Sequence, residues 1–182
     1  RVSHFITLNE PQIVLKLGYC DGVHAPGRRY PLPRLVQCWK NLMLAHGLAH
    51  RAIRSAAPGA QIGIASTGKL CYPHTPADEE AARNETFRLS DADWMFTHPI
   101  TLDAVCFGRV EPEPGALSSL MRNISQEDWN IIHTTPDFIG INSYNGSEIT
   151  ADADGRPVYL PRPRGFPCTA LKWPVTPEIM EY

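Results

Sequence analysis

The chain has 182 residues, of which 17 are lysine or arginine and 19 are aspartate or glutamate, so its formal charge is −2. Apolar residues make up 43% and charged residues 20%, which excludes a disordered tail and is typical of a globular domain. A general nucleic-acid binder would need a basic excess, and no run approaches the roughly 20 consecutive apolar residues of a membrane span. We therefore expect neither a nucleic-acid nor a membrane partner.

The cysteines and the chain ends bear on where the protein works. The five cysteines are far apart and form no Cys-x-x-Cys pair, which favours a reducing compartment over a disulfide framework or a structural zinc site. The chain begins at Arg1 without an initiator methionine or a signal peptide, and 174–182 resemble the opening of another helix. We expect both ends to be cut, so the cytoplasmic location that we predict rests on the cysteines alone.

Three short segments have the composition of buried strands: 4–8, 61–65 and 137–142. They are rich in apolar and β-branched residues and show no helical stripe. Because they are apolar on both faces, they resemble the strands of a parallel sheet that is covered on both sides.

Helices are predicted between these strands. The first begins near Pro33 and is stopped by Pro58-Gly59, and one continuous apolar face is formed by Leu35, Trp39, Leu42, His46, Ala49 and Ile53. A second is predicted over 78–96, where acidic residues occupy the positive end of the helix dipole. A short third helix begins after an N-cap at Ser125 and reaches about His133.

Alternating strands and helices indicate a parallel α/β fold. The long excursions at 11–32, 66–77 and 100–123 would lie, in a (β/α)₈ barrel, at the C-terminal face of the strands where active sites are built. Three strands cannot close a barrel of roughly 250 residues, so we expect 1–182 to be one partial barrel domain. Its two open sheet edges should need the missing barrel portions or a second copy to cover them.

The sharpest chemical feature is the segment 7–11, Thr-Leu-Asn-Glu-Pro, at the end of the first strand. Pro11 cannot continue a central strand, so Glu10 should project at the mouth of the barrel beside the amide of Asn9. A carboxyl group there is a candidate general acid. The alternative is a glutamate that caps a neighbouring helix or binds water.

Other signals are assigned to packing. His46 and His50 have a metal-ligand spacing, but Gly47 follows His46 and His46 lies on the apolar stripe, so we predict a core histidine and no metal site. Trp39 and Trp94 are predicted to be core residues.

Segment 7–11 resembles the Thr-Phe/Leu-Asn-Glu-Pro element of the family-one retaining β-glycosidases, the β-glucosidase family. Four further segments resemble that family in the right order: 18–27, 41–49, 137–144 and 172–178. The resemblance implies the central segment of a (β/α)₈ barrel, about strands four to six and the approach to strand seven, incomplete at both ends.

The resemblance also implies roles for particular residues. Glu10 matches the acid/base, and Asn9 matches the residue that bonds the sugar 2-hydroxyl. Tyr144 matches the tyrosine that orients the nucleophile, Asn142 forms a polar wall, and Trp173 matches an indole platform for the sugar. No cofactor is needed, because side chains carry both proton transfers.

Two further candidates rest on their position in the sequence alone. Tyr19 and His24 lie in the long segment after Glu10 and are candidates for the rim of the substrate site.

The departures from the family define what the chain lacks. The nucleophile's Thr-Glu-Asn-Gly element is expected beyond Tyr182, and the first strands, with further sugar contacts, before Arg1. Phe5 stands where the family commonly has tryptophan, Ser143 replaces an aromatic residue, and 100–113 lack the expected Gly-x-Tyr-Pro pattern. The resemblance therefore implies a retaining hydrolase of β-linked glucosides or galactosides that acts by double displacement, with a β-glucoside or oligosaccharide as substrate. We expect the isolated segment to hydrolyse nothing. The alternatives are a 6-phospho-β-glycosidase of the same family and a non-catalytic carbohydrate-binding or split-barrel fragment.

Overall fold

The computed structural model describes residues 2–181. They form two compact units. The first comprises the chain up to Thr67 together with Leu89–Asn142, and the second comprises Gly68–Arg88 together with the chain from Ser143 onward. That 1–182 make up one domain stays a prediction.

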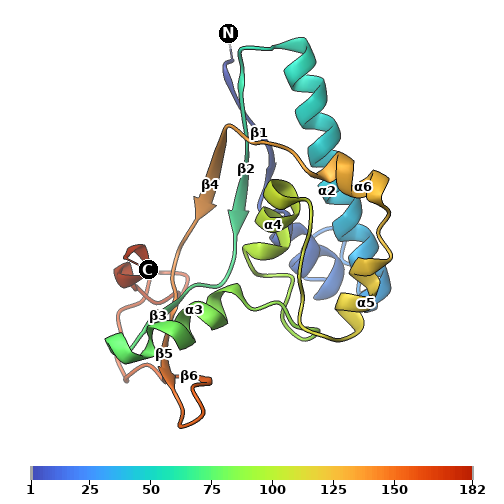
Figure 1. Ribbon diagram of the computed structural model, residues 1–182. Coiled ribbons are helices and arrows are strands. Elements are labelled where there is room, and N and C mark those ends of the chain that lie inside the picture. The colour runs from blue at the N-terminus through green and yellow to red at the C-terminus, as the bar shows by residue number, and fades with distance from the viewer. Residues whose placement is uncertain (1, 182) are drawn as a thin grey trace. The chain divides into compact units, whose positions relative to one another are not determined.

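The first unit contains a parallel sheet and the helices that pack against it (Figure 1). Its elements are β1 (His4–Asn9), α1 (Pro11–Ile13), the π-helix η1 (Val14–Cys20), α2 (Leu32–Ala56), β2 (Gln61–Thr67), α4 (Pro99–Phe107), α5 (Ala116–Arg122), α6 (Gln126–Ile132) and β4 (Phe138–Asn142).

All strands of this sheet run parallel, in the order β1-β2-β4. The central strand β2 contains Ile62 and Ile64, both fully buried. The register pairs Asn9 with Ala65 and Thr67 with Asn142, so the C-terminal ends of the three strands lie at one edge of the sheet. The three predicted strands and their parallel arrangement are confirmed, but the predicted burial on both faces is confirmed for β2 alone, since β1 and β4 each carry exposed residues.

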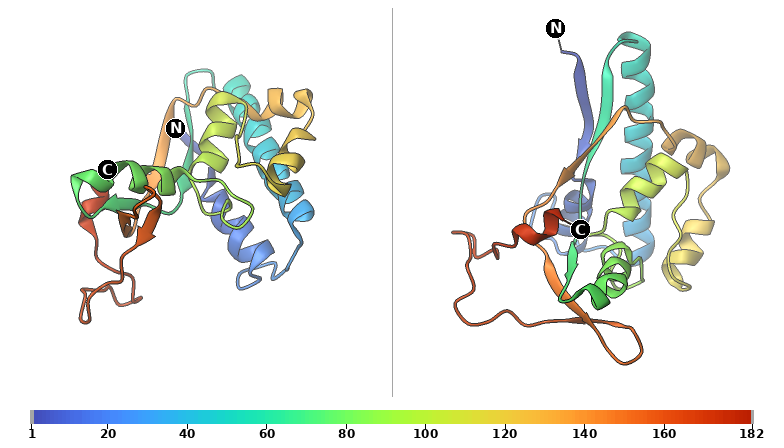
Figure 2. Two further views of the ribbon diagram at one scale, coloured as in Figure 1. Left: turned by 60° about the horizontal axis from the view of Figure 1, so that its bottom comes forward. Right: turned by 60° about the vertical axis from the view of Figure 1, so that its left-hand side comes forward.

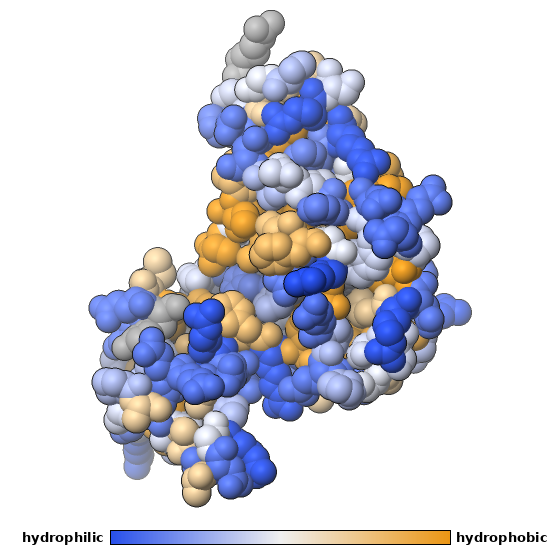
Figure 3. Space-filling model, viewed as in Figure 1, coloured by the Kyte–Doolittle hydropathy of each residue, from blue (hydrophilic) through white to orange (hydrophobic). Residues whose placement is uncertain are grey.

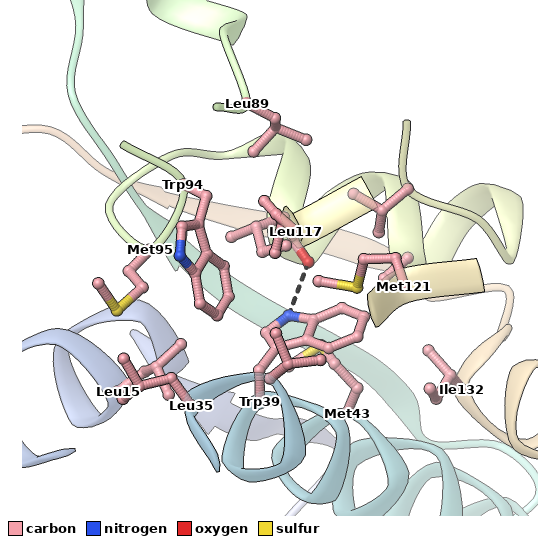
Figure 4. Packing of buried hydrophobic residues seen from close by; sticks show 14 of the residues in the cluster. Leu15, Leu35, Trp39, Met43, Leu89, Trp94, Met95, Leu117, Met121 and Ile132 are labelled. Carbon is pink, nitrogen blue, oxygen red and sulfur yellow. Dashed lines mark hydrogen bonds between the residues drawn. The ribbon is translucent and has the colours of Figure 1, made fainter. Parts of the chain in front are cut away.

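Helix α2 follows the predicted stripe and runs alongside the sheet in each view (Figures 1 and 2). Its buried face packs into the main core together with side chains from η1, α4, α5 and α6 (Figure 4). Trp39 and Trp94 are core residues, as predicted, with 2% and 1% of their surfaces exposed. The indole Nε1 of Trp39 donates to the carbonyl oxygen of Ile100 at 2.9 Å, so its one polar atom is satisfied inside the core.

The prediction of a helix over 78–96 is wrong in its extent. That helix is α3 (Glu79–Phe87), in the second unit, and it stops before Arg88, which is extended. Downstream, Ser90 and Asp93 bond each other's backbone in a tight turn, since serine and aspartate side chains compete with helical hydrogen bonds. The next helix that packs into the main core is α4 (Pro99–Phe107), which begins after the predicted helix and extends into the excursion 100–123.

Two of the three excursions, 11–32 and 100–123, contain helices, and the third, 66–77, contains the strand β3 (Cys71–Pro73). Helix α4 has a proline in its first turn and ends at Gly108, whose φ of 64° is left-handed. The excursion 11–32 opens with α1 and η1. The short helix α6 is confirmed: the Ser125 hydroxyl accepts the backbone N–H of Asp128 at 3.1 Å.

The second unit has a small sheet that the sequence did not predict. Its elements are β3 (Cys71–Pro73), the 3₁₀ helix η2 (Pro76–Asp78), α3, β5 (Ser147–Ala151), β6 (Pro157–Tyr159) and the 3₁₀ helix η3 (Pro177–Met180). Strand β5 is parallel to β3 and antiparallel to β6. The Asp78 carboxylate joins η2 to β5, since it accepts from the hydroxyls of Thr75 and Thr150 and from the backbone N–H groups of Thr75 and Ala151. These bonds lower the pKa of Asp78 to about 2.

Edge strand β4 carries exposed apolar side chains. Ile139 and Ile141 are 44% and 52% exposed, and apolar surface lies over this strand in the space-filling view (Figure 3). Among the described residues, no strand pairs with the outer edges of β1 and β4 in this sheet. That missing barrel portions or a second copy cover these edges stays a prediction.

His46 is a satisfied core histidine, as predicted. It is fully buried, and its two ring nitrogens lie 2.6 Å and 2.9 Å from the hydroxyls of Thr7 and Thr134. Within residues 2–181, no cluster of three or more histidine, cysteine, aspartate or glutamate side chains has the arrangement to hold a metal ion. The same residues include no helix with the length and hydropathy to cross a membrane.

The buried state of His46 predicts a pH-dependent stability. Burial, and then the neighbouring His50, lower the pKa of His46 from 6.5 to about 4. Between these values the unfolded chain binds a proton that the folded chain does not, so the free energy of unfolding should fall as the pH is lowered from 6.5 to 4. The loss is on the order of 3 kcal/mol, because one pKa unit corresponds to about 1.4 kcal/mol.

Urea unfolding at pH 7 and pH 4.5 checks this expectation. In His46→Gln the difference between the two pH values should shrink, whereas the exposed control His24→Gln should keep it. An unchanged difference in His46→Gln would contradict the assignment.

Candidate active site

Glu10 lies where the chain turns sharply out of β1. Its φ and ψ are 50° and 57°, a left-handed conformation that is uncommon for a residue other than glycine. The backbone N–H of Glu10 still donates to the Ala65 carbonyl oxygen of β2 at 2.9 Å, and its own carbonyl oxygen accepts from the N–H of Ile13. The predicted strand end before Pro11 is therefore confirmed, and the backbone at Glu10 is strained, which costs about 1–3 kcal/mol and is common at functional sites.

Three of the predicted residues meet at this edge of the sheet. The side-chain amide of Asn142, the last residue of β4, donates to Glu10 Oε1 at 2.5 Å and to Asn9 Oδ1 at 3.2 Å. These side chains come from strands on either side of β2, where the paired residues Ala65 and Gly140 are small. A Cβ atom at Gly140 would lie 3.2 Å from that of Ala65, so glycine avoids a tight contact between β2 and β4 at this point.

The group is a half-buried carboxyl with amide neighbours at the carboxyl ends of parallel strands. An amide N–H donating to a carboxylate oxygen fixes the orientation of that carboxyl, and the amide oxygens can hold hydroxyl groups. The arrangement is suited to proton transfer to or from a bound polyhydroxyl compound.

Tyr144 and Trp173 form an aromatic pair in the second unit. Their ring centroids are 5.4 Å apart, the planes are inclined at 56°, and the side chains are 58% and 43% exposed. Trp173 lies in a turn whose ends are joined by Thr169, since the N–H of Thr169 donates to the Trp173 carbonyl oxygen. Exposed flat rings of this kind can cover the C–H faces of a sugar.

The two loop candidates lie in the segment after Glu10. Tyr19 is half-buried on η1, packs against the main core and stacks on Tyr30 with ring centroids 5.8 Å apart. His24 is exposed, and its backbone N–H donates to the carbonyl oxygen of Leu17 at 3.0 Å.

Sequence reasoning missed a set of buried polar residues behind Glu10. Gln12 is only 2% exposed and contacts Ser66 at the end of β2, which in turn contacts His98 before α4. A glutamine two positions after Glu10 in an otherwise apolar helical turn was the available signal.

Comparison with known proteins decides the family. The model of glycosyl hydrolase family 1 matches residues 1–161. The chain belongs to glycosyl hydrolase family 1. β-Glucosidase A of Thermotoga maritima is 31% identical to this family 1 chain in an alignment that covers 98% of the chain. A 6-phospho-β-galactosidase of Clostridium acetobutylicum is 28% identical over 83% of this chain, which spans 33% of that enzyme.

Solved structures of the family share the fold. A Thermotoga maritima β-glucosidase in complex with noeuromycin matches 98% of this chain with a TM-score of 0.72 and 28% identity. The chain spans about 39% of the length of β-glucosidase A and 38% of that structure. The predicted fold class is therefore confirmed: the parallel sheet of the first unit is part of the family's (β/α)₈ barrel.

Proposed function

We propose that this chain provides the acid/base side of a retaining β-glucoside hydrolase active site, with Glu10 as the proton donor. The observation that carries the proposal is the contact of 2.5 Å between Glu10 and Asn142 at the C-terminal edge of the parallel strands. Active sites of (β/α)₈ barrels lie at this edge. Membership of a glycosyl hydrolase family gives the chemistry that a carboxyl group there would perform.

The proposed reaction has two displacement steps. In the first, Glu10 donates its proton to the glycosidic oxygen while a second carboxylate attacks the anomeric carbon, so the C–O bond breaks and the aglycone leaves as an alcohol. In the second, the Glu10 carboxylate removes a proton from water, which displaces the carboxylate from the sugar. The two carboxyl groups must be about 5–5.5 Å apart, and we place the second one outside these 182 residues.

The neighbouring residues are proposed to bind the sugar. Asn9 would hold the 2-hydroxyl, a contact that tightens as the transition state gains oxocarbenium character, and Asn142 would orient Glu10. Trp173 would form a platform for the sugar and aglycone, and Tyr144 would orient the nucleophile. Tyr19 and His24 remain candidates for the rim.

The similarity to a 6-phospho-β-galactosidase keeps a second substrate class open. A phosphorylated sugar needs cationic partners, and arginines occur at positions 28, 29, 162 and 164. The two classes differ in one group, so a pair of aryl glycosides with and without the 6-phosphate separates them.

The test compares the isolated chain with a completed barrel, in which this chain is joined on both sides to the remaining segments of Thermotoga maritima β-glucosidase A. The isolated chain should release no nitrophenol from 4-nitrophenyl β-glucoside, because it lacks the nucleophile. The completed barrel should release it, and circular dichroism and gel filtration check that both proteins are folded.

Either of two results would count against the proposal. Turnover by the isolated chain at a rate like that of the completed barrel would place the nucleophile within these residues. A folded completed barrel that binds glucosides without cleaving them would favour the non-catalytic carbohydrate-binding alternative.

A further inference from the structure

A buried network of hydrogen-bonded side chains, Gln12, Ser66 and His98, lies next to the turn that carries Glu10. Gln12 Nε2 lies 2.7 Å from Ser66 Oγ and 3.2 Å from the Thr97 carbonyl oxygen, and Ser66 Oγ lies 3.0 Å from His98 Nδ1. Gln12, Ser66 and His98 are 2%, 0% and 5% exposed. These hydrogen bonds therefore link α1, the end of β2 and the start of α4 inside the first unit.

The direction of these hydrogen bonds follows from the groups involved. The Thr97 carbonyl oxygen can only accept, so the atom of Gln12 facing it is the nitrogen, which also donates to Ser66 Oγ. The single hydroxyl proton of Ser66 is then available to His98 Nδ1, which accepts it as the unprotonated nitrogen of a neutral imidazole. Burial lowers the pKa of His98, which favours this neutral form.

The backbone of Glu10 is anchored on both sides, by a strand bond before it and by Gln12 after it. The Glu10 N–H is bound by the carbonyl oxygen of Ala65, and Gln12, two residues later, is bound by Ser66 next to it. Pro11 between them has a fixed φ and adds stiffness. With both anchors made, the strained left-handed turn at Glu10 is held; without the second, that turn can relax and move the carboxyl away from Asn142.

We infer that Gln12 is a positioning residue, which acts with Ser66 and His98 to hold the Glu10 carboxyl against the amide of Asn142. The consequence for catalysis rests on the proposed function, whereas the effect on the Glu10–Asn142 contact does not.

Nuclear magnetic resonance on the 182-residue chain tests the contact. The side-chain amide protons of Asn142 should be shifted by their bond to the carboxylate and protected from solvent exchange. In Gln12→Met their exchange should be at least about tenfold faster and their shifts close to those of a free asparagine. Gln37→Met, at an exposed glutamine that bonds Asn41 on α2, is the matched control and should leave both unchanged.

A second pair of variants separates positioning from general destabilisation. His98→Asn keeps an acceptor oxygen near the place of Nδ1, and the Asn142 signals should stay close to those of the parent chain. His98→Leu removes the acceptor, so the Asn142 amide protons should exchange faster and their shifts should approach those of a free asparagine. An equal loss of Asn142 protection in His98→Asn and His98→Leu would overturn the inference. So would a folded Gln12→Met chain whose Asn142 signals do not move.

Kinetics in the completed barrel give the catalytic readout. Gln12→Met should lower kcat on β-glucosides with poor leaving groups by about 10- to 100-fold with little change in KM, since small displacements of catalytic groups carry costs of this size. If the Asn142 signals move but Glu10→Gln has no selective effect on poor leaving groups, the proposed function fails and the positioning role stands. If Glu10→Gln is selective but Gln12→Met leaves both the signals and kcat intact, the positioning role fails alone.

Discussion

Glu10→Gln in the completed barrel should lower kcat on alkyl β-glucosides, which have poor leaving groups, by about 10²–10⁴-fold. A glutamine has the size of the glutamate and can keep a contact with Asn142, but it has no proton to give to the departing oxygen. A dinitrophenolate leaves without protonation, so the glycosylation step on dinitrophenyl β-glucoside should lose far less. The measurement is kcat/KM across a series of aryl and alkyl glucosides, in which the variant's rate should depend steeply on the leaving-group pKa.

The second half of the reaction gives an independent check. In Glu10→Gln the glycosyl-enzyme has no general base for water, but azide needs none, so added azide should accelerate turnover of dinitrophenyl β-glucoside and yield β-glucosyl azide. The control Glu127→Gln, at an exposed position in the first turn of α6, should show neither the selective loss on poor leaving groups nor the acceleration by azide. An equal loss on all leaving groups without azide rescue would assign Glu10 a structural role.

The parts of the fold that were predicted correctly have strong local signals. The strands β1, β2 and β4 are short apolar runs, and α2 has an apolar stripe that is bounded by prolines and Gly59. Asn9 and Glu10 were found because Pro11 ends the strand. That they meet Asn142 follows from parallel pairing with β2, which brings the carboxyl ends of strands more than 130 positions apart in sequence to one edge.

The parts that were missed depend on contacts distant in sequence. Residues 79–87 form a helix, but the rest of the predicted helix 78–96 does not, since Ser90 and Asp93 close a turn and the chain passes from one unit to the other after Arg88. The left-handed backbone of Glu10 and the bonds of Gln12 to Ser66 exist only once α1, β2 and α4 are assembled. Strands β3 and β6 are too short to show a periodic pattern, and they are defined by their pairing with β5.

Gly47→Ala should destabilise the chain by about 3 kcal/mol and lower its melting temperature by roughly 10 °C. Helix propensity alone predicts the opposite, since alanine in place of an interior glycine stabilises a helix by up to about 1 kcal/mol. However, a Cβ atom at Gly47 would lie 1.9 Å from the carbonyl oxygen of Ile131 in α6. Backbone of one helix cannot yield as a flexible side chain can, so α2 and α6 would have to separate beside His46 and the main core.

The matched control is Gly59→Ala. Gly59 follows α2 in the loop to β2, its φ is not left-handed, and a Cβ atom there would meet nothing within 4 Å. This substitution should be neutral or stabilise slightly, because alanine restricts the unfolded chain more than glycine does. Thermal unfolding of both variants beside the parent chain therefore separates close packing from the intrinsic cost of glycine. If Gly47→Ala is as stable as Gly59→Ala, α2 and α6 do not approach as closely as described. The position of His46 between Thr7 and Thr134 would then have to differ as well.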